Sequence, residues 1–465
     1  MRESQLSFEP FELIDLTEYS GVKELNEHGI VHFSGLIDSS DTQKYLQMGM
    51  DEVWATVKAY SETGGTQILF YGIVTDLDVF VEGDVTSISV ELQSGTYLME
   101  HGLHTRTFQD NGITYSTILN TCLSSYEAGS AKMICGGNST ISSFVAQYKE
   151  SDWEFAKRMA SHFHTVLVPE MQTRGVRFYF GVPNNSSNSI TTKAFSVKKQ
   201  MKEYVRKRDK GLSGIQENDA VYYIVKNRDI HNLGDNITLN GKSLYIVKIE
   251  SELEGSELYH IYYLKSKKGM EVPKSYNYGL VGASLNGNIT SVQKDVVQVN
   301  ITDDENGNSG VRWFPYSTVY SSPDGTGWYC MPEPGDSVRV YMPSEDEAEA
   351  YVISSTHTST GSGEARSNPD NKSIMNKYGK EVLFTPNSLI MTNNKGMSIE
   401  ILDEEGIRII SNKEISIKSE EKIEIGSSAG DVQVIAPEAI TLTQGDTTTK
   451  LMENVLLKGS QVNME

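Results

Sequence analysis

Two histidine pairs have the spacing closest to that of a metal site. His162 and His164 are two residues apart, and a helix over this stretch would point their side chains roughly 200° apart. His101 and His104, in His-Gly-Leu-His, are better spaced but have no evident third ligand. We therefore expect packing or surface roles for these four residues, with no bound metal and no cofactor.

An acidic turn at 303–308, Asp-Asp-Glu-Asn-Gly-Asn, carries carboxylates of the kind that bind Ca²⁺. It lacks the downstream bidentate glutamate of an EF-hand, so a solvated hairpin is the expected structure. The sequence contains no nucleophile elbow, phosphate-binding loop or His-Glu-x-x-His motif. The chain has 62 acidic residues, so a catalytic pair of carboxylates cannot be identified from the sequence. No catalytic residue is predicted, and we expect the protein not to be an enzyme.

The overall charge limits the range of partners. The 465-residue chain has a net charge of −21, which disfavours binding to nucleic acid or to anionic lipid. One basic stretch at 198–210 is expected to form a solvated face or a patch between subunits. The three widely spaced cysteines predict reduced thiols in a protein made in the cytoplasm, and no signal-peptide core follows Met1.

The strongest pattern lies near the C-terminus, where a pair of apolar residues recurs about every eight positions. The two residues of a pair are separated by one position, so both side chains point to the same face of a strand. The residues between pairs are almost all polar. The pairs are Ile399 with Ile401, Ile407 with Ile409, Ile415 with Ile417, Ile423 with Ile425, Val432 with Val434, and Ile440 with Leu442.

The eight-residue period predicts an assembly of several chains. Eight extended residues span roughly 26 Å at most, too little to enclose a core between walls about 10 Å apart. Three chains would together supply about 24 residues to each layer, which is enough. The repeat therefore predicts an intertwined trimeric β-helix, or β-prism, with all the paired residues buried on its axis. Two other structures fit the same alternation less well. An antiparallel meander would leave one apolar face uncovered, and a single-chain solenoid needs rungs of about 20 residues or more.

Upstream of the repeat, short apolar strands alternate with turn signals, and two helices interrupt them. Strand-like stretches at 67–74 and 86–92 flank a Glu-Gly-Asp turn. One helix, started by Thr114, is expected at 116–124. A second is expected from Ser151, which forms a capping box with Glu154, through Phe163. This pattern predicts a mainly β protein with inserted helices.

Five of these stretches, taken in order, carry a family resemblance. They are 69–75, 104–110, the aromatic and charged stretch 147–155, and then 313–315 and 331–338. The chain resembles the VgrG-type hub and spike proteins at the tip of contractile injection machines, including the central spikes of phage baseplates. Each stretch alone is moderately specific, and the ordered set is much more so.

The resemblance implies a particular order of domains. Residues 1–278 would form the hub, two similar β-barrels with a helical segment at about 114–165. Residues 279–356 would form an OB-fold domain, residues 357–372 a linker, and residues 373–465 the trimeric β-helical spike. The linker is too short to hold the lysozyme domain found at this place in a well-known phage spike.

The resemblance also implies a function and partners. The protein would cap the tail tube and be driven through the target envelope when the sheath contracts. Its partners would be two further copies of itself, the hexameric tube protein, baseplate proteins, a PAAR-like tip protein at the C-terminal end and, transiently, the target cell envelope. It would belong to a phage tail, a bacteriocin-like particle or a secretion apparatus. The alternative is a trimeric tailspike that degrades glycan or binds a receptor.

Overall fold

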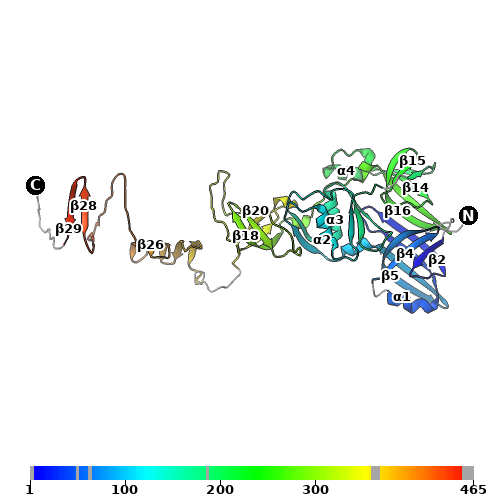
Figure 1. The fold of residues 1–465 in the computed structure, drawn as a ribbon, viewed down its shortest axis with the longest axis horizontal. Helices are drawn as coiled ribbons and strands as arrows, with labels where there is room; N and C mark the ends of the chain where they lie inside the picture. The colour runs from blue at the N-terminus through cyan, green and yellow to red at the C-terminus, as the bar shows by residue number, and fades with distance from the viewer. Residues whose placement is uncertain (1–4, 49–51, 61–64, 185–187, 358–366, 453–465) are drawn as a thin grey trace. The chain divides into compact units, whose positions relative to one another are not determined.

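The computed structural model describes residues 5–48, 52–60, 65–184, 188–357 and 367–452. The chain is mainly β, as the sequence predicted, and its sheets are largely antiparallel (Figure 1). It divides into two compact units, Met1–Thr358 and Ser359–Glu465. Among the described residues, no helix has both the length and the apolar character needed to cross a bilayer.

Twelve strands of the first unit join in one sheet, and they come from two segments that we call the first and second strand blocks. The first strand block contains β1 (Gln5–Glu9), β2 (Asp15–Glu24), β3 (Ile30–Ile37), β4 (Trp54–Tyr60), β5 (Thr66–Glu82) and β6 (Val85–Ser94). The second contains β12 (Asn188–Ile190), β13 (Ser196–Lys199), β14 (Val221–Asn227), β15 (Asn236–Leu239), β16 (Lys242–Glu254) and β17 (Glu257–Lys265).

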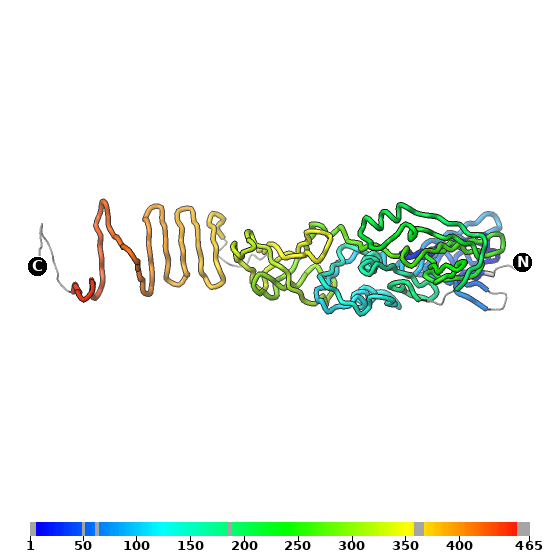
Figure 2. Tube along the Cα trace, turned by 90° about the horizontal axis from the view of Figure 1, so that it is seen from above, coloured from blue at the N-terminus to red at the C-terminus, as the bar shows by residue number. Residues whose placement is uncertain are grey.

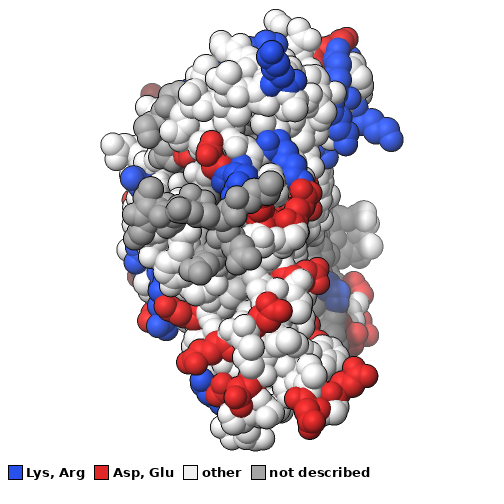
Figure 3. Space-filling model, turned by 90° about the vertical axis from the view of Figure 1, so that its right-hand side faces the viewer, with Lys and Arg blue, Asp and Glu red and all other residues white. Residues whose placement is uncertain are grey.

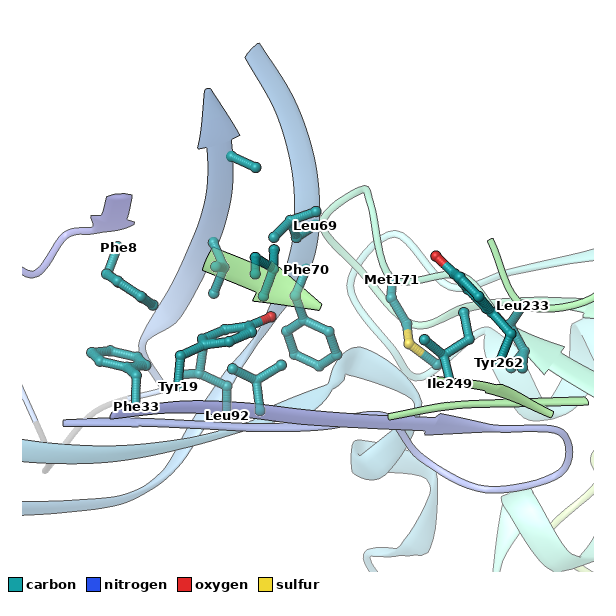
Figure 4. Close-up of a cluster of buried hydrophobic side chains, with 14 of the residues drawn as sticks. Phe8, Tyr19, Phe33, Leu69, Phe70, Leu92, Met171, Leu233, Ile249 and Tyr262 are labelled. Carbon is teal, nitrogen blue, oxygen red and sulfur yellow. The ribbon is translucent and has the colours of Figure 1, made fainter. Parts of the chain in front are cut away.

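The two strand blocks share one sheet and one core. The strand order is β1-β4-β5-β6-β3-β2-β16-β17-β14-β13, so β2 and β16 connect the blocks. In β3 alternate side chains are buried, as expected for a strand with one face on a core. Phe8 stacks on Phe33 in the first block with ring centroids 4.2 Å apart. Ile249 and Tyr262 of the second block belong to the same buried cluster (Figure 4).

A helical insert lies between the two blocks in the sequence and has a core of its own. Helices α2 and α3 begin at the predicted caps, because the hydroxyls of Thr114 and Ser151 accept hydrogen bonds from backbone N–H groups in the first turn. The insert contains β7 (His104–Phe108), α2 (Tyr115–Leu123), β8 (Ser130–Met133), β9 (Val145–Glu150), α3 (Asp152–Ser161), β10 (Leu167–Pro169) and β11 (Arg177–Phe180). The described residues also form the α-helices α1 (Thr42–Met48), α4 (Met201–Asp209) and α5 (Lys267–Met270).

A small five-stranded sheet completes the first unit. Its strands are β18 (Ser284–Gln293), β19 (Val296–Ile301), β20 (Trp313–Pro315), β21 (Ser337–Tyr341) and β22 (Tyr351–Ile353), in the order β20-β19-β18-β21-β22. A bridge between Tyr316 and Val352 links the two ends of this sheet. Phe144 of the insert packs into the same core as Phe314, so the small sheet is joined to the insert by apolar contact.

The second unit is a meander of short antiparallel strands, which Figure 2 shows as successive passes of the chain. Its strands are β23 (Lys372–Met375), β24 (Glu381–Thr385), β25 (Ser388–Thr392), β26 (Met397–Leu402), β27 (Gly406–Ser411), β28 (Ile440–Gln444) and β29 (Thr447–Leu451). Residues 412–439 contain no strand. Gly396 and Gly406 turn the chain with positive φ angles of 90° and 86°, a backbone region that favours glycine.

Candidate functional site: an exposed apolar face and a charged joint

The first predicted spike residues lie opposite one another in the meander. In the β26–β27 pair, Ile399 is opposite Ile409 and Ile401 is opposite Ile407. Side chains directly opposite each other in an antiparallel pair share one face of the sheet. The eight-residue period therefore places both apolar pairs on the same face of a hairpin.

This apolar face extends further upstream than the sequence pattern indicated. Leu389 is opposite Ile401, and Met391 is opposite Ile399. In the next strand, Val382 and Phe384 are opposite Met391 and Leu389. These two pairs fall outside the predicted repeat because the steps between them depart from eight residues. Their spacing of two within each pair was the signal that could have identified them.

A single chain leaves the apolar face uncovered, although the sequence predicted these residues to be buried on an axis. Ile399 and Ile401 expose 47% and 46% of their surface, and Ile407 and Ile409 expose 72% and 59%. The physical reason is that a meander of one chain has no second layer to cover this face. Such a continuous apolar surface indicates a partner that covers it.

The structure differs further from the sequence prediction at the next three pairs. They were expected in strands around the axis, but they lie in 412–439, where the chain forms no strand, and all six side chains are 49–76% exposed. They are Ile415 and Ile417, Ile423 and Ile425, and Val432 and Val434. The physical reason is that eight residues of one chain cannot enclose a core. Both the strand partners and the cover would have to come from other chains, so burial of these six residues stays a prediction for the trimer.

The last predicted pair lies apart from the others. Ile440 and Leu442 belong to the separate β28–β29 hairpin, where they are opposite Leu451 and Thr449. Leu442 is 61% exposed in the single chain, so it too is not buried as the sequence predicted. A two-stranded hairpin has no core of its own, and this side chain also needs cover from outside the chain.

In the first unit, the stretch 147–155 forms the centre of the helical insert. The Asp152 carboxylate is fully buried and accepts hydrogen bonds from Arg106, from Gln147 and from the hydroxyl of Tyr126. The Gln147 and Tyr126 bonds are both 2.8 Å long. The Asp152 charge is therefore paired with Arg106, and its oxygens accept further hydrogen bonds from Gln147 and Tyr126. A buried carboxylate needs such partners to offset the loss of water.

The next residue ties the insert to the first strand block. The Trp153 indole is 1% exposed, and its Nε1–H donates to the backbone oxygen of Asn26 at 3.1 Å. The Asn26 side chain in turn accepts from the backbone N–H of Leu167 at 2.7 Å. The aromatic and charged stretch 147–155 therefore contains residues whose contacts position the insert.

Arg158 links the insert to the small five-stranded sheet. Its guanidinium is 3% exposed and donates to Glu150 in the insert, with Nη2 2.9 Å from Oε2. On the other side Nη1 donates to Oε1 of Glu347 at 2.6 Å. Desolvation raises the pKa of Glu150, although Arg158 acts against this shift. We call this triad, with the contact described next, the charged joint.

The acidic turn at 303–308 forms the second half of the charged joint. Its backbone pairs with β7, because the Glu305 N–H donates to the oxygen of Thr105 at 2.9 Å. The Thr105 and Thr107 N–H groups donate to the carboxylates of Glu305 and Asp304 at 2.8 and 2.9 Å. Desolvation opposes the ionisation of Glu305, but Thr105 and His104 outweigh it and lower the pKa of this carboxyl. Asp303, Glu305, Gly307 and Asn308 are exposed, as expected of a solvated turn, but Asp304 and Glu305 also bind the backbone of β7.

Comparison with known proteins was informative at the level of structure. No family model and no curated protein sequence matches this chain. The E. coli c3393 protein, a component of the type VI secretion system with structural similarity to the T4 tail proteins gp27 and gp5, matches with a TM-score of 0.54. The match has 13% identity and covers 75% of this chain and 99% of that one.

Two structures of the Francisella PdpA–VgrG complex, half-lidded and lidless, match with TM-scores of 0.55 and 0.52. Each has 10% identity and covers 88% of this chain, and 87% and 98% of the matched chains respectively. The chain has the fold of a VgrG-type tail hub and spike. The resemblance inferred from the sequence is confirmed at the level of the fold.

Within this hub fold, the structure separates the four candidate histidines. Helix α3 ends at Ser161, so His162 and His164 do not lie on the helix that the sequence predicted there. His162 Nδ1 lies 2.8 Å from the Tyr115 hydroxyl, and His164 Nδ1–H donates to the oxygen of Val272. His104 Nδ1 lies 2.8 Å from Glu305 in the charged joint.

His101 makes an edge-on ring contact with Tyr97, beside the start of β7. Among the described residues, no group of three or more His, Cys, Asp or Glu side chains has the arrangement of a metal site. The four candidate histidines make ring and hydrogen-bond contacts within the first unit.

A buried histidine predicts that acid destabilises the first unit. His260 is 4% exposed, and burial, with Lys23 and His231 nearby, lowers its pKa to about 4. The unfolded chain takes up a proton near pH 6.5 that the folded chain does not bind, so stability falls as the pH falls below this value. From pH 7 to 5 we expect a loss of about 2 kcal/mol from this group.

The measurement is the free energy of unfolding in urea at several pH values, for the parent and His260→Gln. The variant should lose about 2 kcal/mol less than the parent between pH 7 and 5. Parallel curves for the two proteins would contradict this role for His260.

Proposed function

We propose that three copies of this chain form the hub and membrane-puncturing spike of a contractile injection machine. The observation that carries the proposal is the exposed apolar face along the meander, in a chain with the hub fold. Three copies would turn these faces toward a common axis and exclude water from it. Covering an aliphatic side chain of this size stabilises an assembly by about 1.5–3 kcal/mol, and the repeat multiplies this gain along the rod.

The proposed trimer suits a hexameric tail tube. Each chain has two strand blocks connected through β2 and β16, so three chains would present six blocks. A ring of six similar blocks would dock onto a six-fold tube, and the three-fold rod would continue the axis toward the target. Baseplate proteins would contact the hub, and a PAAR-like tip protein would bind the C-terminal end of the rod.

The proposed role is mechanical, and we propose that the chain is not an enzyme. The charged joint links the insert to the small sheet, and Trp153 links the insert to the first strand block, through buried polar contacts. Sheath contraction would supply the work, so the hub would have to transmit force without separating. Sustained release of sugar fragments from cell walls by the purified protein would contradict this role.

The experiment is a mass measurement of the purified full-length protein in solution, followed by electron microscopy. We expect a species with three times the 51.7 kDa chain mass. Its hub should show six-fold features, and its rod should be three-fold. A folded monomer, or a hub with no six-fold features, would contradict the proposal.

A further inference from the structure

The second strand block carries an exposed surface that is both basic and apolar. It lies on the edge strand β13, the segment before it and helix α4, and we call it the basic patch. Its exposed cations are Lys193, Lys198, Lys199, Lys202, Arg206, Arg208 and Lys210. Among them lie four exposed apolar side chains, Phe195, Val197, Met201 and Val205.

The basic patch also ends the large sheet. β13 pairs with β14 on one side, and among the described residues no strand pairs with its other side. All four residues of β13 are exposed. Lys199 pairs with Glu217, whereas Lys198 and Lys202 form no ion pair with the described residues. An open edge that also exposes apolar side chains is a surface on which another chain can pair.

The first strand block carries the opposite surface. The hairpin of β5 and β6 projects exposed acidic side chains together with apolar ones, and we call its outer part the acidic arm. Asp78, Phe80 and Glu82 lie on one face of the arm because they alternate along β5. Phe80, Val81 and Val85 are 59%, 64% and 54% exposed.

The two surfaces lie at opposite ends of the hub. Figure 1 places α4 at one end of the first unit, above the large sheet, and α1 and β5 at the other. Seen end-on, Lys and Arg gather at the α4 end, and Asp and Glu gather at the α1–β5 end (Figure 3). Residues 5–94 contain three Lys/Arg against sixteen Asp/Glu, whereas residues 188–265 contain thirteen against ten.

We propose that the acidic arm of one copy docks on the basic patch of the next copy, so that the hub closes as a head-to-tail ring. This inference rests on the proposed trimer and identifies the surfaces that would form its hub interface. Two complementary surfaces at opposite ends of a chain make heterologous contacts, which close into a ring when the rotation between copies allows it. In a three-copy ring every patch faces an arm, and no strongly acidic end faces another acidic end.

The apolar and charged residues would have different roles in this interface. Isolated exposed ion pairs add little stability, but complementary charge sets the orientation of docking and excludes wrong pairings. Phe80 on the arm, which shares a face with Asp78 and Glu82, and Met201 on the patch are the apolar side chains that would be buried at its centre. The patch is thus an inter-subunit surface, one of the two roles that the sequence allowed for 198–210.

The test is zero-length carbodiimide cross-linking of the full-length protein, followed by peptide mass spectrometry. This reagent joins an amine and a carboxylate that are in contact. Cross-links should join Lys198 or Lys202 to Asp78 or Glu82. Because arm and patch lie at opposite ends of one chain, such a product must connect two copies. Higher salt should reduce the yield, because ions screen exposed charges.

Charge reversal supplies the matched variants. Lys198→Glu/Lys202→Glu should abolish these cross-links, as should Asp78→Lys/Glu82→Lys, and combining the two pairs should restore them with the roles exchanged. The control Lys132→Glu/Lys294→Glu reverses two exposed lysines outside the patch and should leave the pattern unchanged.

The possible results distinguish a failure of the arm–patch interface from a failure of the proposed trimer. A trimer whose patch lysines are cross-linked elsewhere, or not at all, overturns the arm–patch interface and leaves the trimer standing. A monomer overturns both. If a reversed variant does not fold, the cross-link map of the parent protein decides by itself.

Discussion

Replacing Ile409 with Asp should abolish the stable trimer. In the proposed spike Ile409 faces the axis, so three-fold symmetry brings three introduced carboxylates together in a dry core. Burying an unpaired charge costs several kcal/mol, and we expect a loss of more than about 3 kcal/mol per chain. SDS resistance and thermal melting of the full-length protein measure the effect, and the variant should run as a monomer in SDS under conditions where the parent stays trimeric.

The matched control is Ile410→Asp, the same chemical change at the neighbouring position. Ile410 is 47% exposed and points to the other face of β27, because side chains alternate along a strand. Its replacement should cost no more than about 1 kcal/mol per chain. If the two Asp variants lost the same stability, or if the Ile409→Asp trimer were as stable as the parent, the trimer axis would not lie along the face that carries Ile409.

The second large effect is expected at the charged joint. Arg158→Met removes the guanidinium between Glu150 and Glu347 and leaves two buried carboxylates without their cation. Breaking one side of a buried ion pair costs about 3–5 kcal/mol. Burial already raises the pKa of Glu150, and removal of Arg158 should raise it further, so acid should relieve part of the loss.

Urea unfolding at pH 7 and pH 5, followed by tryptophan fluorescence, tests this expectation. The neighbouring change Lys157→Met is the control, because Lys157 forms a partly exposed pair with Glu154 across one helical turn. Such pairs contribute about 0.3–0.5 kcal/mol. An Arg158→Met protein no less stable than Lys157→Met would show that the triad does not stabilise the joint.

Local patterns in the sequence were sufficient for several features of this chain. The capping residues Thr114 and Ser151 predicted where two helices begin, because a cap depends on the side chain and the next three backbone amides. The paired isoleucines at 399–409 predicted the apolar face, because alternation along a strand is a local property. The ordered stretches from 69 to 338 predicted the hub fold that the solved structures share with this chain.

The same alternation of apolar residues did not determine the structure of the pairs in 412–439 within one chain. Ile417, Ile425 and Val434 repeat the spacing of Ile401, yet they lie in a segment without strands and are exposed. Alternation specifies which side chains share a face, but a strand also needs a partner for its backbone hydrogen bonds. That partner is not available in the single chain, so these pairs depend on assembly.

Contacts between distant residues required the tertiary structure. Arg158 and Glu347 are 189 positions apart, and no local rule relates the acidic turn at 303–308 to β7. The predicted helix past Ser161 ended early, since His164 adopts a positive φ of 54° where the chain leaves the helix.

The amino-acid sequence thus determined the periodic face, the helix starts and the charge of each segment, because each depends on neighbours in the chain. The sequence did not determine that the acidic and basic segments lie at opposite sides of the first unit. Folding places the acidic arm and the basic patch there through the pairing of β2 with β16, and that long-range pairing depends on burial that only the whole sheet provides.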